Sequence, residues 1–544
     1  MSRRAGPSPA RLACAVVVGA FAFFCAWFTG FYPPFSNPNE LSRFQTVVAF
    51  VETGSFAIDS QLATLGDHED KAAAGGRFYS NKAPGLAFAA IPVYRLLRIA
   101  LPPPDSPTAP VLFLLRLFTV SLVCVVALLR FARRMLLSRE GESAAALVTF
   151  AVAFGTPFLY YARSFFAHAW TASLVFLAWD VMRESAAAAS PGGRRARLAL
   201  AGFLAGWALI SEYTVAPVVL ALAVRAAVFP PGRRSGANVL SFAGGAALPV
   251  GLLLAYQAAC FGSPFLPSYA RESYPAYAEL AARRFFGFGL PSPAVALAYL
   301  FHPARGILLF SPFFLWAGVG AARWWRDRRE RADGMLAVVA TAVTFLLLTG
   351  YPNWHGGWAL GSRYLLPLLF LPAAALPFAL ATPLSRGLFA AAAVFAVGVH
   401  LLATSSWPNF PLDFTFPPAS GSAWFLARGW AAPNLGAGVG LPAAISLGIP
   451  LAIALAALAA SLAAARPLAP PTALAALLGA AALAVVLLRP PELSYPARLL
   501  RAAIYGDYSG RDPQRRELAR VVDAASTPLE KRQAARAWST SGPR

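Results

Sequence analysis

Apolar runs of about twenty residues recur along most of this 544-residue chain, and they constrain its fold more than any other feature. A helix of that length crosses the ~30 Å hydrocarbon core of a bilayer. Only 13% of the residues are charged, about half the share expected in a soluble domain. The pattern therefore predicts an all-α polytopic membrane protein and not a series of soluble domains.

The basic residues lie in short clusters between the apolar runs, which is the positive-inside pattern of cytoplasmic loops. The net charge of +22 therefore predicts contact with membrane lipid headgroups and not with nucleic acid. Arginines precede the first apolar run, 12–32, which is longer than the core of a signal peptide and has no cleavage site. We expect residues 1–11 to be a cytoplasmic N-terminus followed by an uncleaved span. The bias toward Ala, Gly, Pro and Arg is typical of a bacterial protein, so the expected location is the bacterial inner membrane.

Alternation of the loops between the two sides predicts about thirteen transmembrane helices, all within a membrane domain at 12–489. After the first, the spans are expected at 109–131, 143–161, 165–183, 196–212, 214–230, 238–261, 304–322, 334–350, 363–382, 386–406, 436–464 and 470–489. Segment 84–100 is predicted to be a juxtamembrane helix, because an odd number of crossings has to separate the first outer loop from the arginines at 130–139. Long outer loops are expected at 33–83, 262–304 and 407–435. The side of the basic C-terminal tail, 490–544, stays open.

The cysteines give no sign of a disulfide framework or a zinc site. All four lie inside apolar segments, without Cys-x-x-Cys or Cys/His ligand spacing. Asp67-His-Glu-Asp70 resembles a metal cluster, but the spacing places no second group of ligands beside it, so a solvated loop is the favoured interpretation. No cofactor is expected, and dependence on a divalent metal stays open.

Chemistry is expected on the outer side, where the longest loops, four of the five histidines and most loop tryptophans fall. The first candidate is Glu40, which follows Asn39 at the start of an amphipathic stretch beyond the first span. A carboxylate there suits a general base toward an acceptor hydroxyl. From spacing alone, the favoured alternative is that Glu40 stabilises a helix N-terminus and pairs with Arg43 three residues later.

Two further candidate segments suit a sugar phosphate. Lys82 precedes Ala-Pro-Gly at the start of the juxtamembrane helix, in a chain that otherwise uses Arg almost throughout. Snorkelling of Lys82 to lipid headgroups is the alternative. The segment Trp354-His355-Gly-Gly-Trp358 lies just before Arg363, which enters the next span. Recognition of a sugar–phosphate headgroup and a role in the aromatic belt of the membrane fit that segment equally.

Two further polar sites lie between or within the predicted spans. A tight outer turn holds Arg163 and His168, which suit a phosphate anchor and a contact with the acceptor or sugar, although a structural role is favoured for His168. Glu212 interrupts a long apolar stretch. Deep in a span it would cost ~2.5–3.5 kcal/mol and need a partner, whereas in an outer turn it would cost little. Both placements of Glu212 stay open.

Taken in order, these motifs resemble those of the GT-C superfamily of integral-membrane glycosyltransferases, in particular the protein O-mannosyltransferases and the aminoarabinose transferases that modify lipid A. Members carry an Asp-Glu pair after the first span and an Arg three residues after the Glu, where this chain has Asn39, Glu40 and Arg43. Lys82-Ala-Pro-Gly stands where those families have Lys-Pro-Pro-Leu. The resemblance covers about residues 12–365.

The second outer loop of these families has Ala-Arg followed by an acid, and Tyr161-Ala-Arg163 matches its first part. This chain departs from the family pattern twice. Asn39 stands where the families have the Asp credited as catalytic base, and His168 stands where the second loop has its acid. Either Glu40 takes over as the base or the chain is a divergent branch with altered chemistry.

The resemblance implies transfer of a sugar from a polyprenyl-phosphate donor to an acceptor hydroxyl of a glycan, lipid or protein, on the outer face of the membrane. A polyprenyl phosphate leaving group is a stable anion that cations stabilise. The cations that suit this role are Lys82, Arg163, Arg305 and Arg363. A carboxylate such as Glu40 then deprotonates the acceptor for in-line, inverting attack.

The competing interpretation is a membrane transporter or lipid flippase without glycosyl transfer. Such a protein is expected to show inverted repeats and ionisable residues at mid-membrane depth. Only His400, together with Glu212 if it is deep, falls at such a depth here. The sequence therefore favours the glycosyltransferase.

Overall fold

The fold is seen in a computed structural model. It describes residues 8–29, 37–104, 109–138, 142–228, 236–328, 330–410, 416–429 and 431–465, with a few isolated positions at 412, 414 and 479 and between 520 and 534. The span expected at 470–489 and most of the tail at 490–544 lie outside the described residues. The description below concerns the described part of the chain.

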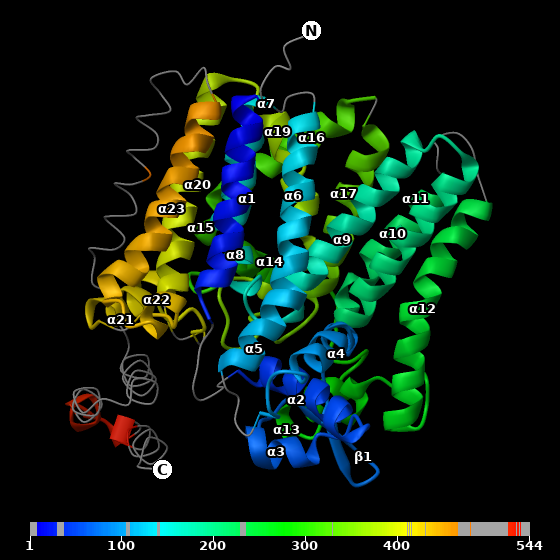
Figure 1. The fold of residues 1–544 in the computed structure, drawn as a ribbon, viewed down its shortest axis with the longest axis vertical. Helices are drawn as coiled ribbons and strands as arrows, with labels where there is room; N and C mark the ends of the chain where they lie inside the picture. The colour runs from blue at the N-terminus through cyan, green and yellow to red at the C-terminus, as the bar shows by residue number, and fades with distance from the viewer. Residues whose placement is uncertain are drawn as a thin grey trace.

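Long helices run side by side between the two ends of the molecule (Figure 1). They are α1 (Pro9–Trp27), α6 (Leu122–Leu137), α7 (Glu142–Phe154), α9 (Ala167–Glu184), α10 (Pro191–Ser211), α11 (Ala216–Ala227), α12 (Gly236–Phe261), α16 (Leu315–Arg326), α17 (Arg331–Thr349), α20 (Pro383–Ser405) and α23 (Ala443–Ala464). Short elements extend or join them: α5 (Ala109–Arg116), η1 (Leu117–Ser121), α8 (Phe158–Tyr161), η2 (Ser185–Ala187), η3 (Tyr213–Val215), α14 (Pro293–Phe301), α15 (Ile307–Phe310), η5 (Pro312–Phe314), η6 (Arg363–Leu368), α18 (Phe370–Ala373), α19 (Leu376–Ala379), η7 (Pro418–Ser422), α21 (Ala423–Ala427) and α22 (Leu435–Gly438).

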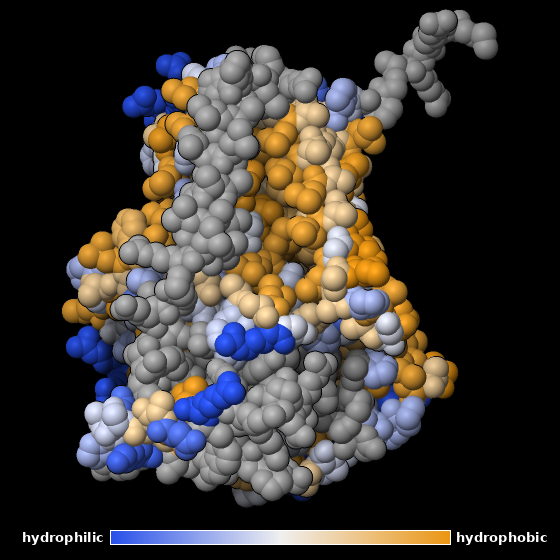
Figure 2. Space-filling model, turned by 90° about the vertical axis from the view of Figure 1, so that its left-hand side faces the viewer, coloured by the Kyte–Doolittle hydropathy of each residue, from blue (hydrophilic) through white to orange (hydrophobic). Residues whose placement is uncertain are grey.

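Six of the described helices are long and apolar enough to cross a membrane: Pro9–Trp27, Pro110–Leu137, Gly236–Phe261, Arg331–Thr349, Pro383–Ser405 and Ala443–Ala464. The face drawn in Figure 2 carries a broad hydrophobic area, with hydrophilic residues gathered toward the two ends of the molecule. The chain is thus an all-α, multi-pass membrane protein, as the sequence predicts. The number of about thirteen spans stays a prediction.

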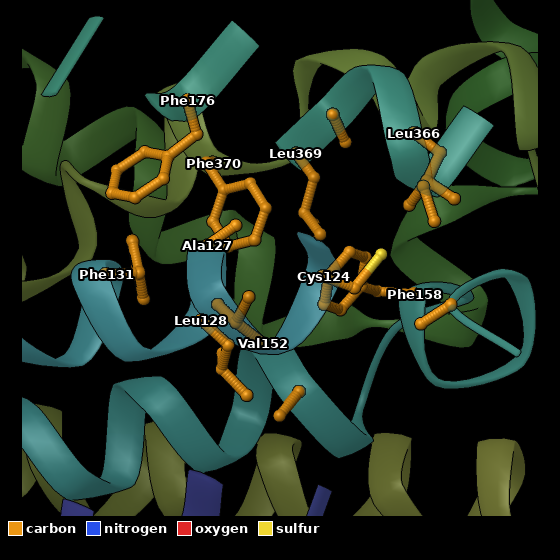
Figure 3. Packing of buried hydrophobic residues seen from close by; sticks show 14 of the residues in the cluster. Cys124, Ala127, Leu128, Phe131, Val152, Phe158, Phe176, Leu366, Leu369 and Phe370 are labelled. Atoms are coloured by element: carbon orange, nitrogen blue, oxygen red, sulfur yellow. The ribbon is translucent and has the colours of Figure 1, made fainter. Parts of the chain in front are cut away.

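The core is packed from aromatic rings that several helices contribute (Figure 3). Phe370, in the broken helical segment that begins at Arg363, has its ring centroid 5.3 Å from that of Phe131, 5.3 Å from that of Phe158 and 4.9 Å from that of Phe176. Truncation of one such buried ring to Ala costs ~3–5 kcal/mol. The interior is therefore a close-packed scaffold that fixes the positions of the helix ends.

Small residues allow α10 and α12 to approach closely. A Cβ added to Gly202 would lie 1.9 Å from the carbonyl oxygen of Phe242, and one added to Gly245 would lie 1.8 Å from that of Ala199. In a membrane, where apolar burial gives little drive for association, helices gain stability from such close backbone contact. Any larger residue at either glycine would separate the two helices.

One end of the molecule, which we call the hairpin end, holds the segment between the first two long helices (Figure 1). Its elements are α2 (Pro38–Thr53), α3 (Asp59–Leu65), β1 (Lys71–Ala74), β2 (Arg77–Ser80) and α4 (Gly85–Leu97), with η4 (Ser268–Arg271) and α13 (Pro275–Ala282) beside them. β1 and β2 pair antiparallel, from Lys71 opposite Ser80 to Ala74 opposite Arg77. Gly75 and Gly76 have φ of +56° and +72°, which a two-residue turn between twisted strands requires. The helix α4 is the predicted juxtamembrane helix.

Ion pairs gather at the opposite end, which we call the arginine end. Arg130 Nη2 lies 2.6 Å from a carboxylate oxygen of Asp180, joining α6 to α9. Asp333 of α17 pairs with Arg183 of α9 at 3.2 Å and with Arg225 of α11 at 3.4 Å. Arg130 belongs to the arginine group at 130–139 that the sequence predicts to be cytoplasmic, and Arg183 and Arg225 lie at the same end of the bundle.

Candidate functional site

Three cations meet at the hairpin end from segments far apart in the sequence. Arg43 lies in α2, Lys82 in the turn between β2 and α4, and Arg363 at the start of η6. The charges of Lys82 and Arg363 both act on Asp70, and those of Arg43 and Arg363 both act on Glu212. We call these three cations, together with the neighbouring side chains of Asp70, Glu212 and His168, the cation cluster.

Lys82 is held against a buried carboxylate. Its Nζ lies 2.9 Å from Oδ2 of Asp70, and the Asp70 side chain is 9% exposed. Burial opposes ionisation of Asp70, but the charge of Lys82 and its hydrogen bond outweigh burial, so the pKa of Asp70 lies below its usual value. Lys82 therefore faces an ionised partner, and its ammonium is positioned by the hairpin.

The expectation of a solvated loop at Asp67–Asp70 is wrong for two of its residues, because His68 and Asp70 are both buried. A ring nitrogen of His68 lies 2.8 Å from Oε1 of Gln45, a buried side chain of α2. Burial lowers the pKa of His68 to about 4. The segment turns inward because it leads into the hairpin, whose strand β2 contacts α2, and because Ser42 Oγ of α2 donates to the carbonyl oxygen of Asp70 at 2.7 Å. A sequence pattern of polar residues does not reveal that docking.

Arg43, Glu212 and His168 form a second part of the cluster. Arg43 Nη2 lies 3.5 Å from Oε1 of Glu212, and His168 Nδ1 lies 3.4 Å from the same oxygen. Arg43 Nη1 also donates to the carbonyl oxygen of Asn39, one turn earlier in α2, and to its side-chain oxygen. Glu212 directly follows α10, in the turn before η3, so it occupies a helix end and not the middle of a span.

Arg363 is surrounded by aromatic rings. Its guanidinium carbon lies 5.4 Å from the ring centroid of Phe166 and 5.3 Å from that of Tyr364. Within the described residues, no carboxylate lies within ion-pair distance of Arg363, and its buried Nε has no hydrogen-bond partner. Gly356, with φ of +69°, leaves room for the side chain, because a Cβ there would lie 2.6 Å from Nε of Arg363. The chain thus holds a cation in place without neutralising it.

A second loop, at residues 268–273, completes the site. Both carboxylate oxygens of Glu272 accept from Nδ2 of Asn81, at 2.8 and 3.1 Å. Ser268 Oγ donates to the carbonyl oxygen of Asn81 at 2.7 Å, and Ser273 N donates to that of Lys71 at 3.0 Å. These bonds fasten residues 268–273 to the hairpin, next to Lys82.

Glu40 lies in a separate, buried ion pair. Its Oε1 is 2.7 Å from Nη2 of Arg116 and also accepts from the backbone N–H of Phe165. Glu40 is 6% exposed and Arg116 3%. The predicted pairing of Glu40 with Arg43 is wrong, because the side chain of Arg43 reaches Asn39 and Glu212 instead.

Arg163 and Arg305 are both buried and bound to backbone carbonyls. Arg163 Nη2 donates to the carbonyl oxygen of Thr404 at 2.7 Å, and its guanidinium carbon lies 4.4 Å from the ring centroid of Phe28. Arg305 donates to the carbonyl oxygens of Ala304, His355, Gly357 and Phe410. Arg305 therefore fixes the loop that precedes Arg363.

The two tryptophans of the segment 354–358 differ in their surroundings, because one packs against other rings and the other is exposed. Trp354 packs edge-on against Tyr299 and His302, with centroids 5.6 and 5.2 Å apart. His355 Nδ1 accepts from the backbone N–H of Gly357 at 3.0 Å, closing the turn. Trp358 is 39% exposed. The motif shapes the loop that leads to Arg363.

Asp70 and Glu272 are the acidic members of the site that the sequence did not single out as functional. In the sequence, Asp70 stands out only as part of the segment that resembles a metal cluster, and Glu272 lies in a long loop without a motif. Asp70 lies ten residues before Ser80, the last residue of the strand that leads to Lys82, and this spacing is compatible with a hairpin. In the described part of the chain, no three His, Cys, Asp or Glu side chains gather as metal ligands, and metal dependence stays open.

No family model matches the chain, and no curated protein matches it. Among solved structures it is similar to ArnT from Cupriavidus metallidurans in the apo state, at 16% identity and a TM-score of 0.45, over 87% of this chain and 76% of that one. It is also similar to the archaeal oligosaccharyltransferase AglB from Archaeoglobus fulgidus, at 12% identity and a TM-score of 0.38, over 93% of this chain and 59% of that one. For the arabinosyltransferase EmbB from Mycobacterium smegmatis the values are 12% and 0.40, over 87% and 43%. The chain thus spans less than two thirds of the AglB and EmbB chains.

Proposed function

We propose that this chain transfers a sugar from a polyprenyl-phosphate-linked donor to an acceptor hydroxyl on the outer face of the bacterial inner membrane. The observation that carries the proposal is the cation cluster. Lys82 and Arg363 come from opposite parts of the sequence to one end of a membrane-embedded helix bundle. We assign that end to the outer side, because the arginine-rich loops gather at the other end.

The chemistry of the donor explains why cations and not acids are needed for the leaving group. When the bond between the anomeric carbon and the phosphate oxygen breaks, the electron pair leaves with the phosphate, which is a stable anion. Preorganised cations stabilise the charge that develops on that oxygen. Arg363, which has no ion-pair partner among the described residues, is suited to bind the phosphate directly. Lys82 supplies a second charge from the hairpin.

The acceptor attacks from the opposite side of the sugar. An in-line attack inverts the anomeric carbon, and a carboxylate takes the hydroxyl proton as the new bond forms. The polyprenyl tail lies among the apolar helices while the sugar meets the polar residues of the hairpin end. This division of the donor between lipid and water is the physical reason for placing the site at a helix end.

The test uses purified protein in lipid nanodiscs with a panel of polyprenyl-phosphate sugars and with glycan, lipid and peptide acceptors. Release of free polyprenyl phosphate is measured for the wild type, Lys82→Ala and Arg363→Ala. We expect both variants to lose ~10²-fold or more of the turnover, as removal of one preorganised donor does elsewhere. Arg77→Ala, in an exposed residue of the same hairpin, is the matched control and is expected to keep its activity.

The same preparation distinguishes glycosyl transfer from the competing function, which is movement of lipid across the membrane. Movement of a polyprenyl-phosphate lipid across liposome membranes, with no release from any donor, would identify a flippase and overturn the proposal. Turnover that survives in both Lys82→Ala and Arg363→Ala would leave glycosyl transfer standing but remove the cation cluster as its site.

A further inference from the structure

The carboxylates near the site differ in how firmly cations hold them. Asp70 pairs with Lys82 at 2.9 Å, Glu40 with Arg116 at 2.7 Å, and Glu212 with Arg43 at 3.5 Å. A carboxylate in a short ion pair is a weak base, because the cation stabilises its ionised form. Asp70 is therefore poorly suited to remove a proton from a hydroxyl. Glu40 and Glu212 are each already occupied by an arginine guanidinium, that of Arg116 and that of Arg43.

Glu272 is held differently. Its hydrogen bonds come from the neutral amide of Asn81, and in the described part of the chain no Lys, Arg or His nitrogen lies within ion-pair distance of it. One amide cannot occupy all the lone pairs of two carboxylate oxygens. Asn81 immediately precedes Lys82, and the charge of Lys82 acts on Glu272, so this carboxylate lies at the same end of the molecule as the cation cluster.

The loop that carries Glu272 is bound to the hairpin at several points. Ser268 and Ser273 bind backbone carbonyls of the hairpin on either side of Glu272, and Glu272 forms a single antiparallel bridge with Ala72 of β1. A group fixed at several points loses little freedom when a substrate arrives, which favours accurate positioning.

We propose that Glu272 is the catalytic base, which accepts the proton of the acceptor hydroxyl during glycosyl transfer. This proposal rests on the proposed function. The acceptor oxygen forms a bond to the anomeric carbon, the bond from that carbon to the phosphate oxygen breaks with its electron pair, and the hydroxyl proton passes to an oxygen of Glu272. The proton later leaves to water, which restores the carboxylate.

The electrostatic surroundings agree with that role. Burial, with a smaller contribution from the charge of Asp70, raises the pKa of Glu272 to about 7 against the opposing effects of Lys82 and of the hydrogen bond from Asn81. A general base works best when its pKa lies near the operating pH, because it is then both ionised and able to hold the proton.

The experiment compares Glu272→Gln with Glu279→Gln in nanodiscs, using any donor and acceptor that the wild type turns over. Glutamine keeps an oxygen for the Asn81 amide, so the loop stays docked. Glu279 lies on α13, is 70% exposed and pairs with Arg283 across one helical turn, so its replacement is the matched control. We expect kcat to fall ~10²–10⁴-fold in Glu272→Gln with little change in KM for the donor, and to be unchanged in Glu279→Gln.

Rescue by azide separates a base from a structural residue. Azide is an anionic nucleophile with no proton to remove, so it is expected to restore release of polyprenyl phosphate by Glu272→Gln and to yield a glycosyl azide. A Glu272→Gln protein that keeps the wild-type kcat, or that folds and binds donor but is not rescued, would overturn the assignment. Absence of turnover in the wild type itself would count against the proposed function instead.

Discussion

Arg116 Nη2 lies 2.7 Å from Oε1 of Glu40, and both side chains are buried. The pair joins α2, at the hairpin end, to the helix that continues from α5 through η1 into α6. The π-helical turn η1 begins directly after Arg116, and such turns alter which side chains face a neighbouring helix. Glu40 therefore fixes the position of α2, and with it Arg43, relative to the bundle.

Glu40→Gln is expected to destabilise the protein. The substitution removes the charge of Glu40 from a buried ion pair with Arg116, and breaking a buried ion pair costs ~3–5 kcal/mol. Thermal unfolding in detergent should show a clear fall in Tm, and the double variant Glu40→Gln/Arg116→Met should recover much of it. A Glu40→Gln protein with the wild-type Tm but no glycosyl transfer would instead make Glu40 the base.

Gly356→Ala is expected to weaken donor binding through Arg363. The new Cβ would lie 2.6 Å from Nε of Arg363, so the guanidinium has to move. Gly357→Ala is the matched control, because Gly357 has a similar φ of +66° but nothing within 4 Å of the added Cβ. Both variants carry backbone strain of ~1–2 kcal/mol, but only Gly356→Ala should raise KM for the donor, by ~10-fold or more if one phosphate contact is lost. Equal KM values in the two variants would contradict this role of Gly356.

The ionisation of Glu272 should make stability depend on pH. Burial raises its folded pKa to about 7 from the ordinary value of 4.5, so between these pH values the folded protein binds more protons than the unfolded chain. The free energy of unfolding therefore falls as pH rises from about 4.5 through about 7. Tm measured from pH 5 to 8 should decline more steeply in the wild type than in Glu272→Gln. Parallel profiles would show that Glu272 has an ordinary pKa.

Asp333→Asn should reduce stability and leave catalysis unchanged. Asp333 is the shared partner of Arg183 and Arg225 at the arginine end, far along the bundle from the cation cluster. Weakening these two charge-assisted bonds is expected to cost ~1–3 kcal/mol. The folded fraction, isolated by size exclusion, should keep the wild-type kcat and KM. Arg195→Gln, in an exposed arginine of α10, is the control for a change of charge at this end and should alter neither property.

The sequence predicted where elements lie along the chain better than it predicted which side chains pair. The turn that holds Arg163 lies where the sequence expects it, between α8 and α9, and the helix expected at 84–100 is α4. The pairing of Glu40 with Arg43 was not found, although both residues lie in one helix. The spacing of two residues within one helix is local geometry. That Glu40 binds Arg116, and Arg43 binds Glu212, depends on which helices pack against α2.

The sequence by itself determined that this chain is a bundle of apolar helices with arginine-rich loops, because hydrophobic length and charge act on each segment separately. It also singled out Lys82 and Arg363 through their rare residue type and their motif. Only the tertiary structure decided that these cations meet Asp70, Glu212 and Glu272 at one end, because those contacts join segments up to hundreds of residues apart. Close packing of helix against helix sets those distances, and no local pattern encodes them.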